Sequence, residues 1–219
     1  MIIDRLRNSD YAWLLENDFK IYPTDTPVTK KIINNWYINN PEFGIVFRDG
    51  NKIEGMNITI PLNRNGWEKL VAGELLESDC DDRYAFNNQR DREIGLHIYH
   101  IRRTGDSKDF YKESLGAINQ NLCKLRKNNN GLTVVGFSAL CCTKMGIGLF
   151  YNKLNCRERA HINTEHIFKK NEKLKIFEIK TQEEMNEKLQ NDYVYLNRCK
   201  MLLTYPKKPS LVWSHIKAD

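Results

Sequence analysis

The chain has 219 residues, of which 41% are apolar and 28% charged, and this composition is typical of a folded globular protein rather than a disordered or fibrous one. No apolar run approaches the roughly 20 residues of a membrane-spanning helix, and the polar N-terminus does not match a signal or transit peptide. The net charge of +6 is scattered, which indicates a solvated basic surface rather than a nucleic-acid interface. We therefore expect a cytoplasmic protein that contacts neither membranes nor nucleic acids.

The cysteines and histidines show no metal-binding pattern. The six cysteines include no CxxC pair, and the five histidines form no HExxH or similar motif, so we expect no metal site. Cys141 and Cys142 end an apolar run and could supply a thiol nucleophile, but no histidine is paired with them in the sequence. Their pattern favours small buried side chains in a reducing compartment.

Two helices are predicted at the N-terminus. Residues 1–20 contain apolar side chains separated by polar ones, and the two prolines within residues 22–27 end that segment. Residues 28–40 then place apolar side chains on one side of a second helix, for which Asp25 or Thr26 would be the N-cap.

A hairpin and a short helix follow. Residues 43–47 and 53–62 are apolar runs on either side of Asp49–Gly50, a strong signal for a tight hairpin turn. A short helix is predicted around Trp67, with Gly73 as its end. The next residues form an acidic patch, interpreted as a solvated loop that could help to recognise a cationic substrate: Glu74, Glu77, Asp79, Asp81 and Asp82.

The middle of the chain predicts a strand, a loop, a helix and a second strand. Residues 94–101 are rich in β-branched and aromatic side chains, and residues 132–140 form a short apolar run, as in strands. Between them, residues 110–127 have apolar side chains at helical spacing after a basic loop. A connection of this kind joins parallel strands. Because such units bind ligands at the carboxyl ends of their strands, we expect the basic loop and the helix start to face an anionic ligand.

The C-terminal part predicts further elements of the same domain. Residues 174–179 are typical of a strand, and Thr181 with Glu184 forms the capping-box pattern of a helix start. The tail is apolar and aromatic, so we expect it to pack against the rest. With no repeat or linker, we expect one domain over residues 1–219, with 181–219 as a C-terminal extension packed on it.

This order of elements is similar to that of the GNAT N-acetyltransferase superfamily. The sequence segments on which the resemblance rests are HIYHI, LGAINQNL, VVGFSAL and GLFYNKLNC. The similarity covers roughly residues 1–180. The resemblance implies an α/β (α+β) fold, with a single domain built on a central mixed sheet. In this sheet an antiparallel N-terminal hairpin and a parallel β-α-β unit are flanked by helices.

The resemblance also implies the transfer of an acyl group from acetyl-CoA, or another acyl-CoA, to an amine on a small molecule or a peptide. In that family the pantetheine arm of CoA lies along the fourth strand, and the loop and helix start that follow hold the pyrophosphate. The residues at the corresponding positions of this chain are Ile98, Tyr99, His100, Ile101, Arg103, Gly105, Ser107 and Lys108.

Catalytic residues are expected at two places. GLFYNKLNC looks like the family's segment whose tyrosine protonates the departing thiolate, which implies this role for Tyr151. The base that deprotonates the amine is expected on the fourth strand, where the candidates are Glu93, His97 and His100. Histidine titrates near neutral pH, which suits this task. Strict alternation would put His97 and Tyr99 on one face of the strand and His100 on the other.

The loop after the fourth strand departs from the family's R/Q-x-x-G-x-G/A pattern, because RRTGDSKDFY contains the single glycine Gly105. Side chains in place of glycines hinder the approach of a phosphate to the backbone. Polar side chains that could compensate are those of Arg102, Arg103, Ser107 and Lys108. Two alternatives therefore stay open: a GNAT-like module that acts through protein interaction without cofactor, and a different α/β phosphate binder. The acceptor and the oligomeric state are also open.

Overall fold

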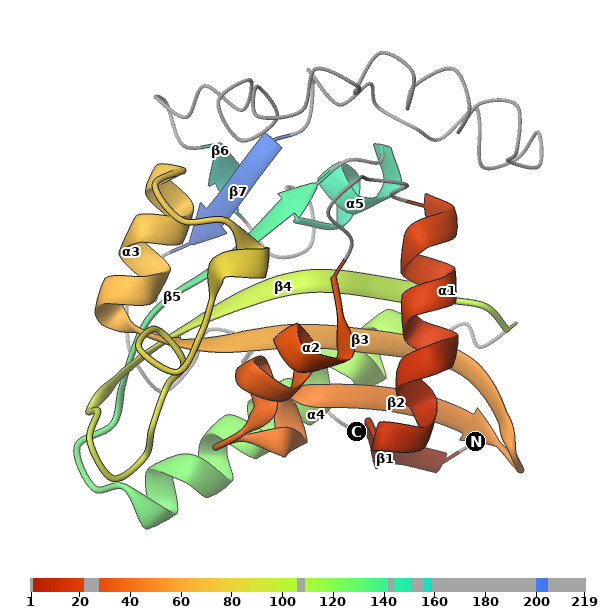
Figure 1. The fold of residues 1–219 in the computed structure, drawn as a ribbon, viewed down its shortest axis with the longest axis horizontal. Helices are drawn as coiled ribbons and strands as arrows, with labels where there is room; N and C mark the ends of the chain where they lie inside the picture. The colour runs from red at the N-terminus through yellow and green to blue at the C-terminus, as the bar shows by residue number, and fades with distance from the viewer. Residues whose placement is uncertain are drawn as a thin grey trace.

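The computed structural model describes residues 2–21, 28–105, 109–141, 144–150, 156–158 and 200–204. Within these residues one sheet holds seven strands in the order β1-β2-β3-β4-β5-β7-β6 (Figure 1). Neighbouring strands are antiparallel except β4 and β5, which run parallel. The predicted mixed sheet is thereby confirmed. The strands are β1 (Ile2–Arg5), β2 (Gly44–Asp49), β3 (Lys52–Asn63), β4 (Glu93–Arg103), β5 (Thr133–Cys141), β6 (Arg157–Glu158) and β7 (Lys200–Thr204).

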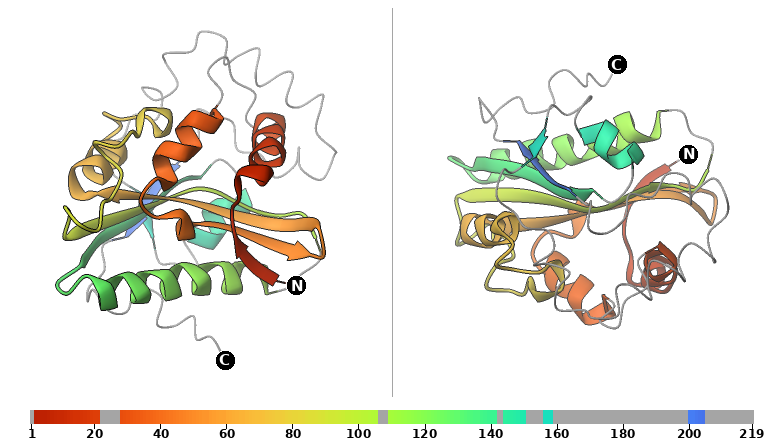
Figure 2. Two further views of the ribbon diagram at one scale, coloured as in Figure 1. Left: turned by 60° about the horizontal axis from the view of Figure 1, so that its bottom comes forward. Right: turned by 90° about the horizontal axis from the view of Figure 1, so that it is seen from above.

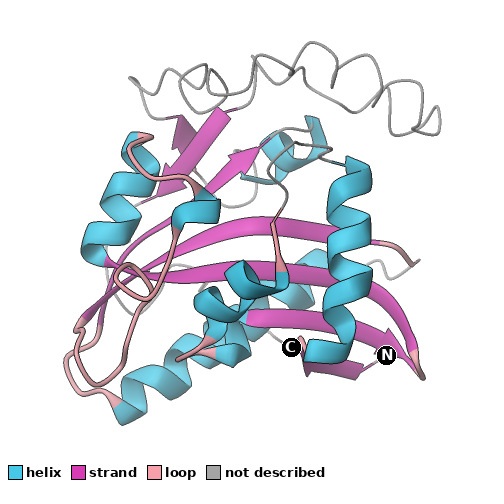
Figure 3. Ribbon diagram, viewed as in Figure 1, coloured by secondary structure: helices cyan, strands magenta, loops and turns pink. Residues whose placement is uncertain are grey.

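Helices cover both faces of this sheet. In Figure 2, α1, α2 and α3 lie on one face, and α4 and α5 lie on the other. Figure 3 shows the loop from η3 to β4 passing over one end of the sheet, beside α3. None of the helices in the described part of the chain is long and apolar enough to cross a membrane. The helices are η1 (Asn8–Asp10), α1 (Tyr11–Ile21), α2 (Lys30–Tyr37), η2 (Pro41–Phe43), α3 (Arg64–Ala72), η3 (Glu77–Asp79), α4 (Phe110–Asn128) and α5 (Lys144–Gly148).

The N-terminal segment differs from its prediction. A helix over residues 1–20 is wrong for the first residues, because Ile2–Arg5 form β1, which pairs antiparallel with β2. Pairing with a neighbouring strand decides the structure of such a short segment, and its own sequence pattern does not. The second helix begins at Lys30, and its N-cap is Thr29, whose hydroxyl oxygen accepts a hydrogen bond from the Ile32 N–H at 3.3 Å. The predicted caps lie outside the described residues.

The hairpin and the short helix after it are confirmed. Gly50 has φ of +57° in the β2–β3 turn, a conformation that glycine adopts without strain. The N-cap of α3 is Asn63, whose side-chain oxygen accepts a hydrogen bond from the Gly66 N–H at 2.9 Å. Gly73, with φ of +77°, ends the helix in the left-handed conformation as predicted.

The strands β4 and β5 separate at their carboxyl ends. Their paired register runs from Glu93–Thr133 to Ile98–Ala139. Beyond this point β4 continues to Arg103 in register with β3, whereas β5 continues in register with β7. In Figure 1 the end of β5 leads toward α5 while β4 extends past α1.

A β-bulge in β4 lies next to the separation. Along β3, Ile58 is paired with His100 and the next residue, Thr59, is paired with Ile98. Tyr99 is therefore an extra residue on β4, and such a residue bends its strand and redirects the neighbouring side chains. The bulge accounts for the change in direction of β4 where it leaves β5.

Helix α4 packs its predicted apolar face on the sheet. Phe110, its first residue, contacts Phe47 edge to face, with ring centroids 4.7 Å apart. The Ser114 hydroxyl accepts a hydrogen bond of 2.7 Å from the side chain of Asn57 on β3, and both residues are buried. These contacts fix the start of α4 beside the end of β4. The strand and helix predicted over residues 174–190 lie outside the described residues, whereas Lys200–Thr204 of the tail form β7.

Candidate functional site

The β4 bulge brings two neighbouring side chains onto helix α1. The Tyr99 hydroxyl donates to Oδ2 of Asp18 at 2.6 Å, and Nδ1 of His100 lies 3.1 Å from Oδ1 of the same carboxylate. Asp18 is only 6% exposed. The prediction from strict alternation, which put Tyr99 and His100 on opposite faces, is therefore wrong, because the bulge breaks the two-residue period.

His97 lies on the same side of the sheet, at the last paired positions of β4 and β5. Its ring is fully buried. Nδ1 is 2.9 Å from the hydroxyl oxygen of Ser138, which faces it across the strand pair, and Nε2 is 2.6 Å from Oε1 of Glu77. An ionised carboxylate only accepts hydrogen bonds, so Nε2 carries the hydrogen and donates it to Glu77.

Glu77 is held in place from two directions. It begins the short helix η3, and its backbone carbonyl accepts a hydrogen bond of 3.1 Å from the indole N–H of Trp36 on α2. Its side chain is bound to His97 and is still 24% exposed. Among the described residues, no hydrogen bond engages its second oxygen, Oε2. A fixed carboxylate with one oxygen available thus lies beside the point where β4 and β5 separate.

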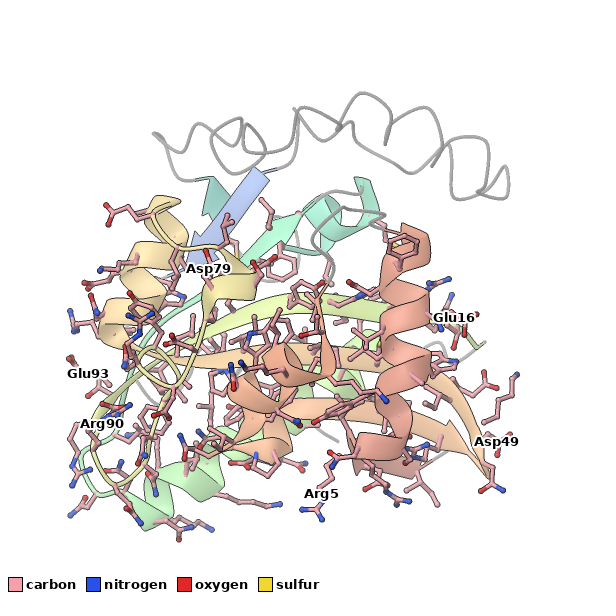
Figure 4. The ribbon with its side chains drawn as sticks, viewed as in Figure 1. Arg5, Glu16, Asp49, Asp79, Arg90 and Glu93 are labelled. Carbon is pink, nitrogen blue, oxygen red and sulfur yellow. The ribbon has the colours of Figure 1, made fainter. Side chains whose placement is uncertain are left out.

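Glu93, a candidate base from the sequence, lies at the other end of β4. Five residues separate it from Ile98, which corresponds to about 16 Å along a strand. Its carboxylate pairs with the guanidinium of Arg64, with Nε 2.7 Å from Oε2. Figure 4 shows Glu93 at the edge of the molecule beside Arg90, at the end of the sheet where β4 begins. This placement does not fit the role of a base at the strand separation.

The predicted cofactor-binding residues are only partly brought together. Ile98 is buried and Ile101 half-buried on β4 before the loop, whereas Arg103 is exposed at its end. The backbone N–H groups of Thr104 and Gly105 both donate to the carbonyl of Glu54 on β3, each at 2.9 Å. Tyr151, Ser107 and Lys108 lie outside the described residues.

A carboxylate also lies against the loop glycine. A Cβ at Gly105 would be 1.8 Å from Oε2 of Glu54, so this side chain packs directly on the glycine. Glu54 is 15% exposed and pairs with Lys52 at 2.5 Å. The absence of a side chain at Gly105 therefore makes room for the Glu54 side chain, and the Gly105 N–H already donates to the Glu54 carbonyl.

No group of three histidine, cysteine, aspartate or glutamate side chains in the described ranges could hold a metal ion. Of the cysteines there, Cys80, Cys141 and Cys156 are buried free thiols, and Cys123 is exposed on α4. Burial raises the pKa of Cys80, as do nearby carboxylates led by Glu77, and burial alone raises the pKa of Cys156. Cys141 is buried in the hydrophobic core, which fits the packing role.

These thiols should differ in reactivity with iodoacetamide at pH 8. We expect Cys123 to be alkylated first, because it is exposed, while Cys80 and Cys156 have raised pKa values and little thiolate. Peptide mass spectrometry over time measures the order. Modification of Cys80 as fast as Cys123 would show that the packing around η3 opens readily.

Sequence reasoning missed three of the residues that define this site. Glu77 was assigned to a solvated acidic loop, while Asp18 and Ser138 were not considered, because neither has a motif around it. Their roles depend on contacts across 20 to 82 positions of the chain: Glu77 with His97, Ser138 with His97, and Asp18 with His100.

No protein-family model matches the chain, and no curated protein is significantly similar in sequence. Solved structures do match in fold. The loading GNATL domain of CurA from Lyngbya majuscula has a TM-score of 0.56 at 9% identity, covering 93% of this chain and 96% of that one. Naa50 of Arabidopsis thaliana, solved with the bisubstrate analogue CoA-Ac-MVNAL, has a TM-score of 0.52 at 8% identity, covering 94% and 98%. Naa20 of Chaetomium thermophilum, also with a bisubstrate analogue, has a TM-score of 0.50 at 10% identity, covering 100% and 93%. The chain therefore has the fold of the GNAT N-acetyltransferase superfamily.

Proposed function

We propose that the protein transfers an acyl group, in the first place acetyl, from acyl-CoA to an amino group of a small molecule or a peptide. The observation that carries this proposal is the position of the Glu77 carboxylate, which His97 fixes beside the separation of β4 from β5. Amine acylation by a thioester requires a base that takes a proton from the acceptor, and this carboxylate lies beside the separating strands. The structural neighbours with bisubstrate analogues support the same class of reaction.

The acyl donor fits the described residues in part. The end of β4, from Ile98 to Ile101, borders the strand separation and would line the pantetheine arm. The N–H groups of Thr104 and Gly105 are occupied by Glu54, so the phosphates would have to be held by later parts of the loop. For this task we retain Arg103, Ser107 and Lys108, whose side chains are suited to phosphate, and the start of α4.

In the proposed reaction acyl-CoA supplies an activated acyl group as a thioester. Oε2 of Glu77 takes a proton from the ammonium form of the acceptor, which makes the nitrogen nucleophilic. The N–H of His97 stabilises the other oxygen and keeps the carboxylate in one orientation. The nitrogen would form its bond to the acyl carbon as the carbon–sulfur bond breaks, and Tyr151 would give its hydroxyl proton to the departing sulfur. The second proton, which the nitrogen loses as it becomes an amide, would restore the tyrosine, and Glu77 would release its proton to solvent. Direct transfer of this kind leaves the acylated amine and the free thiol, with no covalent enzyme intermediate.

Several properties of the whole protein belong to the same proposal. We assign residues 1–219 to a single domain with 181–219 as an extension, and we place the protein in the cytoplasm, in agreement with the free thiols of the four described cysteines. The acceptor is an amine, and neither nucleic acid nor membrane is proposed as a partner.

Binding of the donor is tested by thermal unfolding with acetyl-CoA. At a concentration of 100 times its Kd, a ligand stabilises the folded protein by about 2.7 kcal/mol, or about 5–10 °C for a chain of this size. Turnover is then followed as thiol release with acetyl-CoA and three acceptors: phenethylamine, spermidine and the peptide Met-Val-Asn-Ala-Leu. An unchanged melting temperature with saturating acetyl-CoA would contradict the proposal.

Replacing Tyr151 by phenylalanine tests the general acid. Because the ring is kept and only the proton donor is removed, turnover should fall about 100-fold or more, while the Kd of acetyl-CoA changes little. Both constants are measured on the same preparation. Full activity of Tyr151→Phe would remove this residue from the mechanism.

One observation favours a second function. The packing of Glu54 on Gly105 fills the place where the backbone would approach a phosphate. A GNAT-like module that has lost cofactor binding and acts through protein interaction would show this feature. The thermal-unfolding experiment separates the two, since the module would not respond to acetyl-CoA or CoA.

A further inference from the structure

A pair of glycines opposite each other on β4 and β5 accommodates the indole ring of Trp67. Gly95 is paired with Gly136 in the register of the two strands. A Cβ at Gly95 would come within 2.2 Å of Cγ in the five-membered ring, and a Cβ at Gly136 within 2.2 Å of Cη2 in the six-membered ring. The indole therefore lies across both strands, in a space that exists only because neither position has a side chain.

The position of the indole ring determines which group accepts the hydrogen bond from its N–H. Trp67 is only 1% exposed, and its Nε1 donates to the hydroxyl oxygen of Ser138 at 3.0 Å. Ser138 is two residues after Gly136 on the same face of β5. Four side chains are thus connected in series from the core to the surface: Trp67, Ser138, His97 and Glu77.

The direction of the hydrogen bonds along this series follows from the chemistry of its ends. The indole N–H can only donate, and the carboxylate of Glu77 can only accept. The Ser138 oxygen accepts from Trp67, so its own hydrogen is available for Nδ1 of His97. His97 then carries its hydrogen on Nε2 and donates to Glu77. Only one assignment of donors and acceptors satisfies all three hydrogen bonds. Rotation of the imidazole would break both of the bonds that His97 makes.

We propose that Trp67 and Ser138 are positioning residues of the acyl-transfer site, which act through His97 to fix the tautomer of the imidazole and the orientation of the Glu77 carboxylate. This inference rests on the proposed function, in which Glu77 is the base. A buried network whose hydrogen bonds are all satisfied keeps its side chains in one arrangement, whereas apolar contacts alone would allow several. Catalysis is sensitive to such geometry, because a misplacement of about 1 Å can cost about 100-fold in rate.

Three variants disturb the series at different points. Trp67→Phe removes the N–H, Ser138→Ala removes the hydroxyl, and Gly136→Ala displaces the indole without removing any polar group. Two matched controls keep the series intact. Ser114→Ala removes a buried hydroxyl on the opposite face of the sheet. Gly116→Ala adds a methyl group on α4, with no atom within 4 Å other than those of the helix backbone and the two neighbouring residues.

The first measurement is steady-state kinetics with acetyl-CoA and one acceptor. This acceptor is whichever of phenethylamine, spermidine and the Met-Val-Asn-Ala-Leu peptide the wild type acylates fastest. We expect kcat to fall by about 10- to 100-fold in the three variants, with KM for both substrates changed less than about twofold. The double variant Trp67→Phe/Ser138→Ala should be no slower than Ser138→Ala, because the two residues act as a unit. A kcat equal to that of the Gly116→Ala control in all three variants would overturn the inference.

The second measurement does not depend on activity. The Nε2–H proton of His97, bonded to a carboxylate at 2.6 Å, should give a downfield proton resonance in the wild type, assigned by its loss in His97→Asn. The resonance should shift or broaden in Ser138→Ala and Trp67→Phe and stay in place in Ser114→Ala. An unchanged resonance in folded Ser138→Ala and Trp67→Phe would overturn the inference. A wild type with this resonance but no turnover would contradict the proposed function alone.

Discussion

Replacing Glu77 by glutamine is expected to lower kcat by about 100- to 10,000-fold, the range associated with the loss of a general base. Glutamine has nearly the same shape and can still accept the hydrogen bond from Nε2 of His97, so the packing of η3 should be kept. It cannot take a proton from the acceptor amine. The Kd of acetyl-CoA should change little, since the proposed function has the carboxylate act on the acceptor and not on the donor. Steady-state kinetics and a binding titration of the same variant measure the two effects.

The matched control for this variant is Glu74→Gln, in the same acidic loop but exposed and outside the hydrogen-bonded series. It carries the same loss of charge, so it reports any general electrostatic attraction of a cationic acceptor. If both variants lose activity equally through a higher KM, the acidic patch attracts the substrate and Glu77 is not the base. In that case the Asp18–His100 pair is the next candidate on this face.

Replacing Asp18 by alanine is expected to destabilise the protein by about 3 kcal/mol. The carboxylate accepts hydrogen bonds from the Tyr99 hydroxyl and from His100, and both partners would be left without this acceptor. Each buried polar group that loses its partner costs about 1–3 kcal/mol. Because these two residues form the β4 bulge, the loss would also loosen the attachment of α1 to the sheet. Urea unfolding monitored by circular dichroism measures the change.

The control for this prediction is Glu16→Ala, two residues away on the exposed side of the same helix. A substitution there should change stability by less than about 0.5 kcal/mol. Figure 4 shows Glu16 at the outer side of α1. Equal stability of Asp18→Ala and Glu16→Ala would mean that the bulge holds its shape without the carboxylate.

The local sequence was sufficient for much of the fold. The turn at Asp49–Gly50, the end of α3 at Gly73 and the apolar stripe of α4 were predicted from residues close to one another in the chain. The parallel pairing of β4 with β5 also followed, because a crossover helix between two strands permits little else. The first strand did not follow, since four residues at a sheet edge depend on their neighbour for their structure.

The candidate site was predicted less well, and for a physical reason. The sequence pointed to His97 and His100 on β4, yet it could not show that a bulge at Tyr99 would turn His100 toward α1. Nor could it show that Glu77 would reach His97 across 20 positions.

The sequence by itself thus determined the β2–β3 hairpin, the helices α3 and α4 and the parallel pairing of β4 with β5, because helical period, strand alternation and turn chemistry are properties of neighbouring residues. Only the tertiary structure decided which side chains meet where β4 and β5 separate. Trp67, Ser138 and Glu77 come from three different elements, and their hydrogen bonds to one another and to His97 exist only once the sheet and its helices have packed.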